Sequence, residues 1–596
     1  MRRSAWTMGV ALLAALSLGV AACGGDDGGN ESSNNAPTGE GKPTEGKQGG
    51  KLTVLWAGDV DYSDCGQAYF QATYTICYAT QRPLYSYKPD DGVQMVPDLA
   101  ESLPEVSEDG KTVTVKIRPG VKFSPPVDRE VTSKDVKYGV ERMFFSTVAT
   151  GYAFYFEDIV GAEAGAKPGT KIEGIETPDD QTIVFKLSKA TGGVMASGSL
   201  GLLATAPVPE EYAAQLDRET PTTYGENQVA TGPYMIENDP NCASPTEPCK
   251  AIGYEPQKRI HLVRNPNWDK ATDYKPAYLD EIDNLSGNDD PDVASRRILT
   301  GDNMVNGDWT PGPASLKLAV DEHKDQLIIS PGATIRYISL NTTVPPFDNL
   351  DVRKAVNAGF DRSALRLARG GELIGDIATH YLPPTIAGFD EAGGMEGTGV
   401  DFLSADGKPN DALAAEYMKK AGYASGKYEG NERLLAVASN QGTAPAVAQI
   451  TKEQLEKLGF KVTLRLVTTN TMYTKFCSIP SANVASCPSA AWGKDFSDGQ
   501  TILDPVFNGD NITKQANNNY AELDVPEINE KMQAAKLLTE PADRAAAWGE
   551  ADRLITENAP GVPWLWDKWP NIRSANVNGV VNLWNTSWDL NFTSIK

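Results

Sequence analysis

The feature of this chain that most restricts its fold is a helix that runs directly into a strand near residue 459. From Pro445 to Leu458, apolar residues recur at helical spacing, and Gly459 follows at the position where glycine commonly ends a helix. Residues 461–467 then read Lys-Val-Thr-Leu-Arg-Leu-Val, which has the alternation and the β-branched content of a strand. A helix that feeds a strand across so short a turn is typical of an α/β fold.

Length and charge narrow the class of protein further. The chain has 596 residues, of which 40% are hydrophobic, so it can bury a large core divided over two or three structural units. Its formal net charge of −24 argues against nucleic acid as a partner, because phosphate binding needs clustered lysines and arginines.

The first residues predict export and a lipid anchor. Arg2 and Arg3 precede an apolar run, Trp6–Val20, that is too short to span a membrane and is followed by small residues and Cys23. This arrangement resembles a bacterial lipoprotein signal, in which cleavage before Cys23 leaves a lipid-bearing cysteine at the outer face of the cell membrane, in an extracellular or periplasmic setting. The polar stretch Gly24–Gly50 cannot bury a core, and we expect it to be a disordered tether.

The remaining cysteines predict local disulfides. They fall into three pairs that are close in sequence, which favours bridges within each pair in an oxidising compartment, although the sequence alone leaves the connectivity open. The chain has no Cys-x-x-Cys, so a zinc ribbon or a redox motif has no support. The pairs are Cys65 and Cys77, Cys242 and Cys249, and Cys477 and Cys487.

One heptad, Trp492–Asp498, combines residue types that suit a binding site. It reads Trp-Gly-Lys-Asp-Phe-Ser-Asp, with Gly493 able to let a ligand approach the backbone and Asp495 offering a carboxylate. Aspartates in such loops are commonly turn residues, so the heptad alone does not decide between a site and a turn.

Longer strings carry a family resemblance. The chain resembles the family 5 extracellular solute-binding proteins, the peptide- and nickel-type receptors of ABC importers, over essentially all of the sequence after Lys51. The strings are Val-Pro-Asp-Leu-Ala-Glu-Ser at 96–102, Ser-Glu-Asp-Gly-Lys-Thr-Val-Thr-Val at 107–115, Ala-Thr-Gly-Pro-Tyr at 230–234, Arg-Asn-Pro-Asn-Trp at 264–268 and Pro-Phe-Asp-Asn-x-x-Val-Arg-x-Ala-Val-Asn at 346–357.

The resemblance implies an α/β, two-lobed, periplasmic-binding-protein-like fold (type II, cluster C) with an extra domain inserted in the first lobe. On this basis we expect a signal peptide at 1–22, a tether at 23–50, the first lobe at 51–84, 206–334 and 566–596, the inserted domain at 85–205 and the second lobe at 335–565.

The resemblance also implies a binding site. In peptide-binding members, an aspartate in a Trp-x-x-Asp segment binds the α-ammonium of the ligand, and this position matches Asp495, with Trp492 as an aromatic wall beside Gly493. Those members also hold the ligand backbone like an added strand. We map that segment to Tyr69–Thr73 and expect Tyr69, Gln71 and Thr73 to contribute.

The resulting prediction is a receptor that closes around short peptides and delivers them to a membrane permease driven by a separate ATPase, acting as a monomer without chemistry of its own. No cofactor or metal is expected, since only three histidines are present, and the hydrolase and nucleotide-binding motifs Gly-x-Ser-x-Gly, His-Glu-x-x-His and Gly-x-x-x-x-Gly-Lys-Ser/Thr are absent. Two alternatives stay open: the same fold binding an oligosaccharide or a signalling peptide, and a lipid-anchored hydrolase.

Overall fold

The computed structural model describes residues 43, 45–148, 150–515 and 517–596. The predicted signal peptide, Cys23 and most of the predicted tether therefore lie outside the described residues. Within these ranges, no helix has both the length and the apolar character needed to cross a membrane.

The first lobe is built on a six-stranded sheet. Strand β1 (Lys51–Leu55) runs parallel to β11 (Glu281–Leu285) on one side and to β12 (Met304–Asn306) on the other. The antiparallel strands β10 (Arg259–Arg264) and β8 (Tyr234–Ile236) extend the sheet beyond β11, and β9 (Tyr254–Glu255) pairs with β10. Helix α1 (Gln71–Thr80) shares a core cluster with Leu52 and Val54 of β1, whereas Leu55 packs with α5 (Pro291–Thr300) and α6 (Pro313–Glu322).

A second sheet forms what we call the β5 domain. Its strands are β4 (Glu105–Val106), β5 (Thr112–Lys116), β7 (Thr182–Lys186) and β6 (Ile175–Asp179), in that order and antiparallel throughout. Helix α2 (Ser133–Arg142) covers β6 and β7 and begins with the capping box of Thr132 and Asp135. The short helices η1 (Ala153–Phe156) and α3 (Gly192–Ser197) flank this sheet and later form one wall of the site.

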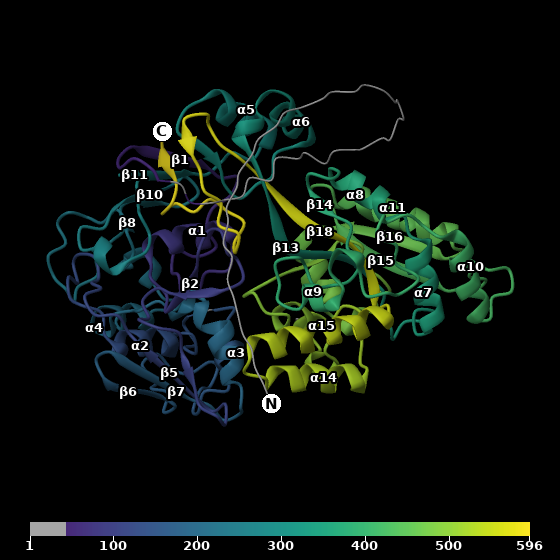
Figure 1. The fold of residues 1–596 in the computed structure, drawn as a ribbon, viewed down its shortest axis with the longest axis horizontal. Helices are drawn as coiled ribbons and strands as arrows, with labels where there is room; N and C mark the ends of the chain where they lie inside the picture. The colour runs from purple at the N-terminus through teal and green to yellow at the C-terminus, as the bar shows by residue number, and fades with distance from the viewer. Residues whose placement is uncertain (1–42, 44, 149, 516) are drawn as a thin grey trace, which may run out of the picture. The chain divides into compact units, whose positions relative to one another are not determined.

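Two long strands connect the lobes. Strand β13 (Leu327–Ser339) pairs antiparallel with β18 (Gly561–Ile572) from one end to the other, with irregularities between Pro331 and Ile335 and between Arg336 and Tyr337. The Leu327 end of this ribbon packs in a first-lobe core, and its Ser339 end passes into the core of the second lobe. Figure 1 shows the two strands passing side by side between the halves of the molecule. Our expected boundaries at 334/335 and 565/566 fall inside these strands and stay predictions.

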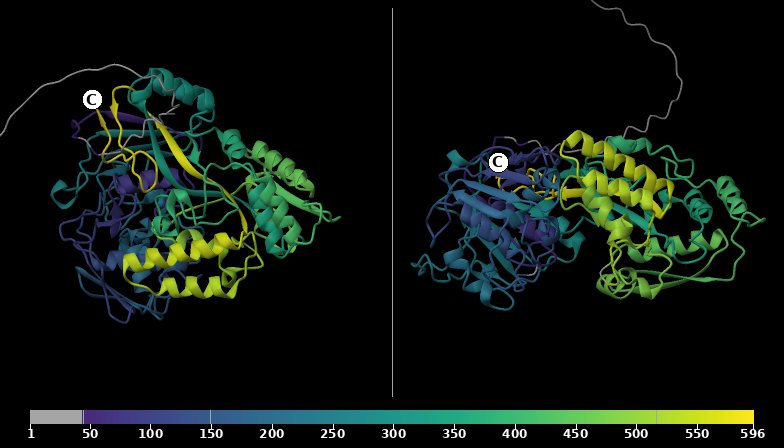
Figure 2. Two further views of the ribbon diagram at one scale, coloured as in Figure 1. Left: turned by 45° about the vertical axis from the view of Figure 1, so that its right-hand side comes forward. Right: turned by 90° about the horizontal axis from the view of Figure 1, so that it is seen from below.

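The second lobe contains the helix-to-strand unit that the sequence predicts around Gly459. Helix α11 (Ala444–Lys457) leads through Gly459 into β16 (Lys461–Val467), which pairs parallel with β15 (Arg433–Ser439). Gly459 has a φ of 101° and lies against the Tyr428 backbone, so both its conformation and the lack of space favour glycine. Helices α7 (Leu350–Gly359) and α10 (Asp411–Lys420) pack together in this lobe, as do α14 (Pro526–Lys536) and α15 (Pro541–Glu557) (Figure 2).

The ends of the described chain return to the first lobe. Strands β19 (Val577–Asn578) and β20 (Ser594–Ile595) pair with each other, and Trp588 is buried in the β1 core cluster. The last residues that we assigned to the tether are not free, because Gly49 donates its N–H to the Tyr278 carbonyl oxygen at 2.7 Å. Backbone hydrogen bonds need no apolar side chains, so composition could not reveal this attachment.

The three close cysteine pairs form the local disulfides that we predicted. Cys65 is bonded to Cys77, Cys242 to Cys249, and Cys477 to Cys487. Each bridge closes a short loop, so it stabilises the local chain rather than linking the lobes.

Candidate functional site

The heptad Trp492–Asp498 passes from the second lobe into the β5 domain. Trp492 and Gly493 end strand β17 (Ala490–Gly493), which pairs with β13. Three residues later, Phe496 is fully buried in the core of the β5 domain and stacks edge-on against Tyr155, with 4.9 Å between ring centroids. Its ring occupies the space above Gly198, where an added Cβ would lie 2.1 Å from Phe496 Cδ2. This segment therefore joins the two halves of the molecule.

Asp495 is a buried carboxylate held by phenols. Its side chain is 7% exposed, Tyr155 Oη donates to Oδ2 at 2.5 Å, and the Tyr69 hydroxyl is a second donor. Within the described part of the chain, no lysine, arginine or histidine forms an ion pair with it. Burial raises the pKa of the Asp495 carboxyl to about 6, although the two hydroxyl donors act in the opposite direction. Asp495 thus lacks the cation that a buried carboxylate normally has.

Two local features position the phenols. Asp61 accepts hydrogen bonds from the backbone N–H groups of Tyr69 and Phe70, at 2.8 and 3.1 Å, and so fixes the turn that precedes α1. Tyr155 lies on η1, opposite the heptad. The carboxylate is therefore held between the first lobe, the β5 domain and the second lobe.

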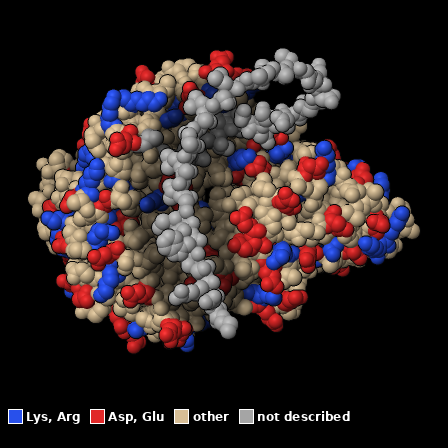
Figure 3. All heavy atoms as spheres, viewed as in Figure 1, with Lys and Arg blue, Asp and Glu red and all other residues tan. Residues whose placement is uncertain are grey.

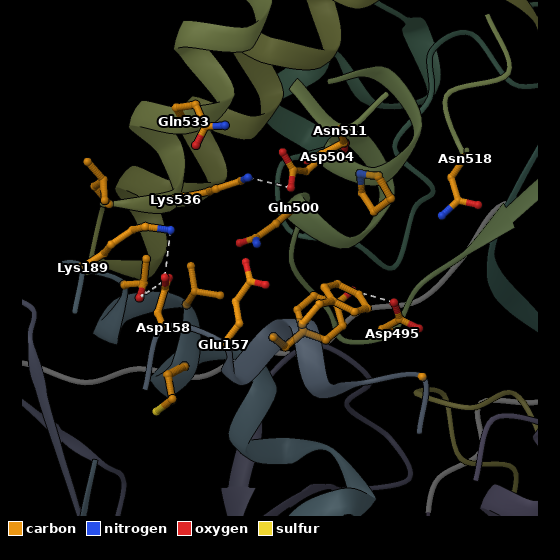
Figure 4. Close-up of a pocket in the computed structure, with 18 of the residues that line it drawn as sticks. Glu157, Asp158, Lys189, Asp495, Gln500, Asp504, Asn511, Asn518, Gln533 and Lys536 are labelled. Carbon is orange, nitrogen blue, oxygen red and sulfur yellow. Dashed lines mark hydrogen bonds and ion pairs between the residues drawn. The ribbon is translucent and has the colours of Figure 1, made fainter. Parts of the chain in front are cut away.

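A cavity of about 980 Å³ opens beside Asp495 (Figure 4). The β5 domain supplies one wall and the second lobe supplies the other. Two carboxylates in it are already paired: Asp158 with Lys189 at 2.9 Å, and Asp504 with Lys536 at 2.7 Å. The charged and polar lining residues include Glu157, Asp158 and Lys189 on one side and Gln500, Asp504, Asn511, Gln533 and Lys536 on the other.

A smaller cavity of about 300 Å³ lies on the other side of the same carboxylate. Tyr69 and Asp495 line both cavities, so Asp495 stands at their junction. The walls of the smaller cavity are rich in aromatic side chains, including Tyr74, Trp569 and Trp584.

The predicted site residues divide into those that line a cavity and one that does not. Trp492 lines the larger cavity, and its indole N–H donates to the Thr501 carbonyl at 2.7 Å, while Gly493 lines the smaller one. Gln71 also lines the smaller cavity, but its amide already donates to the Asn585 carbonyl at 2.7 Å. Thr73 is 1% exposed, bonds to Asp61 and lines neither cavity.

The segment that we expected to act as a strand-like clamp differs in the structure. Gln71–Thr73 is the first turn of α1, so its backbone is not arranged as a strand edge. The available edge is β17, which is the last strand of its sheet and pairs only with β13 among the described strands.

Two further heptad residues have partners within the protein. Asp498 is not simply a turn residue, since Arg544 binds it through two hydrogen bonds of 2.9 Å, both side chains being buried. The Lys494 ammonium donates to Ser497 Oγ at 3.1 Å and lies 5.7 Å from the Trp584 ring centre. Burial lowers the pKa of Lys494 to about 7.

Sequence reasoning missed Tyr155 and Glu157, which lie about 340 residues before Asp495. The run Tyr-Ala-Phe-Tyr-Phe at 152–156 is the one available signal, because so many aromatics in a short loop suit a binding wall. In the part of the chain that the structure describes, no three His, Cys, Asp or Glu side chains gather to hold a metal ion.

Comparison with known proteins places these features in context. The family model described as "Bacterial extracellular solute-binding proteins, family 5 Middle" matches residues 94–514. Di/tripeptide-binding protein 3 of Pseudomonas aeruginosa is 24% identical over 79% of this chain and 81% of its own length. Heme-binding protein A of Haemophilus influenzae is 25% identical over 78% of each chain.

A solved structure shows the same fold. The clavulanic acid biosynthesis oligopeptide binding protein 2 superposes with a TM-score of 0.79 and 26% identity, covering 93% of this chain and 96% of its own. The α/β, two-lobed fold that we predicted is thereby confirmed.

Proposed function

Because the chain belongs to family 5 of the bacterial extracellular solute-binding proteins, we propose that it captures short peptides and that Asp495 binds their α-ammonium group. The observation that carries this proposal is a buried carboxylate that lacks a cation and stands at the junction of two cavities. A peptide α-ammonium supplies both the missing charge and three N–H donors, and such charge-assisted bonds are short and strong.

The remaining features suit a peptide rather than a single small ion. The edge of β17 offers main-chain groups beside Gly493 to a peptide that lies along it as an added strand. Trp492 supplies an aromatic wall to the larger cavity. The polar lining leaves room for water around the side chains of the bound peptide, so peptides of different sequence can be accommodated.

Closure of the lobes completes the proposed mechanism. Opening about β13 and β18 would withdraw Asp495 and Phe496 from the β5 domain, and closing would bring Tyr155 back to the carboxylate. We propose that a lipid on Cys23 holds this receptor at the membrane and that the closed form delivers its peptide to an ABC permease. In this scheme the chain performs no chemistry. The face in Figure 3 carries positive and negative side chains interspersed.

The test combines ligand identification with titration. Mass spectrometry of the solutes released from the purified protein should find short peptides, and isothermal titration should show that a free-amine tripeptide binds more tightly than its N-acetylated form. A sugar as the sole released ligand, or equal affinity for both tripeptides, would overturn the proposal.

A further inference from the structure

The larger cavity carries more negative charge than the α-ammonium of a peptide can neutralise. Its lining includes four carboxylates, of Glu157, Asp158, Asp495 and Asp504, but only two ammonium groups, of Lys189 and Lys536. The two lysines are held by Asp158 and Asp504, as described above. If a peptide amine occupies Asp495, Glu157 is left as the carboxylate of this lining that forms no ion pair with any described residue.

Glu157 is placed to meet a ligand. It follows η1, the short helix that carries Tyr155, and its exposed side chain makes no ion pair or hydrogen bond to any described residue. Figure 4 shows its carboxylate pointing into the cavity toward Gln500. Its negative charge adds to that of Asp158 in raising the pKa of Lys189, but Glu157 forms no ion pair with that lysine. On the second-lobe wall, Gln500 Oε1 is buried and has no donor among the described residues. Glu157 and Gln500 therefore lie on opposite walls of the same space.

The wall beside these acceptors is aromatic. Phe154 lines the cavity, is 51% exposed and lies 3.9 Å from Tyr155 between ring centroids. A planar guanidinium stacks on such rings and presents five N–H donors, so it can serve several acceptors at once. A lysine ammonium has the same charge with fewer donors, and a carboxylate ligand would meet repulsion.

We propose that the cavity around Glu157 binds a basic side chain of the peptide, with arginine preferred over lysine. This inference rests on the proposed peptide-binding function and adds a substrate class to it. The bound peptide is then anchored twice, through its α-ammonium at Asp495 and through its guanidinium at Glu157.

Isothermal titration at pH 7.5 tests the inference with Ala-Ala-Ala and with the three tripeptides in which one alanine is replaced by arginine. The best arginine peptide should bind about 10-fold more tightly than Ala-Ala-Ala, a gain typical of one charge-assisted bond in a hydrated cavity. Glu157→Gln should remove this preference, so that the best arginine peptide binds the variant no more than about 2-fold more tightly than Ala-Ala-Ala does. Glu157→Lys should instead bind the tripeptides in which glutamate takes the place of arginine more tightly than the arginine peptides. A structural defect would not produce such a reversal.

The matched control is Glu176→Gln, which changes an exposed glutamate of β6 outside the cavity and should behave as the wild type. Equal affinity of all four peptides for the wild type, or an arginine preference that survives Glu157→Gln, would overturn the inference alone. If Ala-Ala-Ala does not bind, or binds equally well when N-acetylated, the proposed function fails and the inference fails with it.

Discussion

Replacing Asp495 with asparagine removes one charge and little else. Asparagine has the same shape, and its amide oxygen can still accept from the hydroxyls of Tyr155 and Tyr69. A hydrogen bond to a charged group contributes about 1.5–3 kcal/mol, which corresponds to a loss of about 10- to 150-fold in affinity. We expect Asp495→Asn to weaken binding of a free-amine tripeptide within this range.

Comparing two ligands makes the prediction specific. In the wild type, N-acetylation should cost a similar factor, because it removes the ammonium that Asp495 binds. In Asp495→Asn, the free and acetylated tripeptides should bind almost equally, because the carboxylate that distinguishes them is gone. Isothermal titration at pH 7.5 measures all four affinities, with Glu176→Gln as the control variant.

The thermal stability of the variant separates binding from folding. The burial that raises the pKa of Asp495 means that its ionised form is disfavoured in the folded protein. Asp495→Asn should therefore keep or raise the melting temperature of the ligand-free protein while it weakens binding. The reasoning is refuted if the variant binds the free-amine peptide as tightly as the wild type, or if it still discriminates against the acetylated one.

Three further predictions concern pH and closure. Because the ligand-free Asp495 carboxyl has a pKa of about 6 and peptide binding requires its ionised form, affinity should fall about 10-fold when titrations move from pH 7.5 to pH 5; a flat profile contradicts this. Gly198→Ala should weaken peptide binding, since the added Cβ would lie 2.1 Å from Phe496 Cδ2 and displace that ring, and small-angle scattering should then show no ligand-induced compaction. Burial lowers the pKa of Lys494 to about 7, so the unfolded state binds the Lys494 proton more tightly than the folded state does. The free energy of unfolding measured in urea should therefore rise with pH from 7 towards 10. The variant Lys494→Met should lack this rise.

The parts of the fold that sequence predicted well are those that local chemistry decides. Gly459 follows the end of α11 because the backbone there has a positive φ, which glycine adopts without strain. The sequence indicates this end, since the helical spacing of apolar residues stops at Leu458 and a glycine comes next. The cysteine pairs could be predicted because the two cysteines of each pair are only 7 to 12 residues apart in the sequence.

The site was only partly predictable because its geometry depends on distant contacts. The heptad pointed to Asp495, but nothing near it indicates that Tyr155, 340 residues earlier, donates to its carboxylate. For the same reason, nothing near Asp498 in the sequence indicates that Arg544 binds its carboxylate. The strand-like clamp at Tyr69–Thr73 was predicted from the family resemblance alone. The structure differs because helix α1 begins at Gln71.

The most direct test of the central claim is a crystal structure of the protein with a free-amine tripeptide bound. We predict that the α-ammonium nitrogen lies about 2.7–3.2 Å from an Asp495 carboxylate oxygen, with the lobes closed over the peptide. A bound peptide whose ammonium is held by other residues, with Asp495 still bonded only to Tyr155 and Tyr69, would contradict the proposed role of this carboxylate.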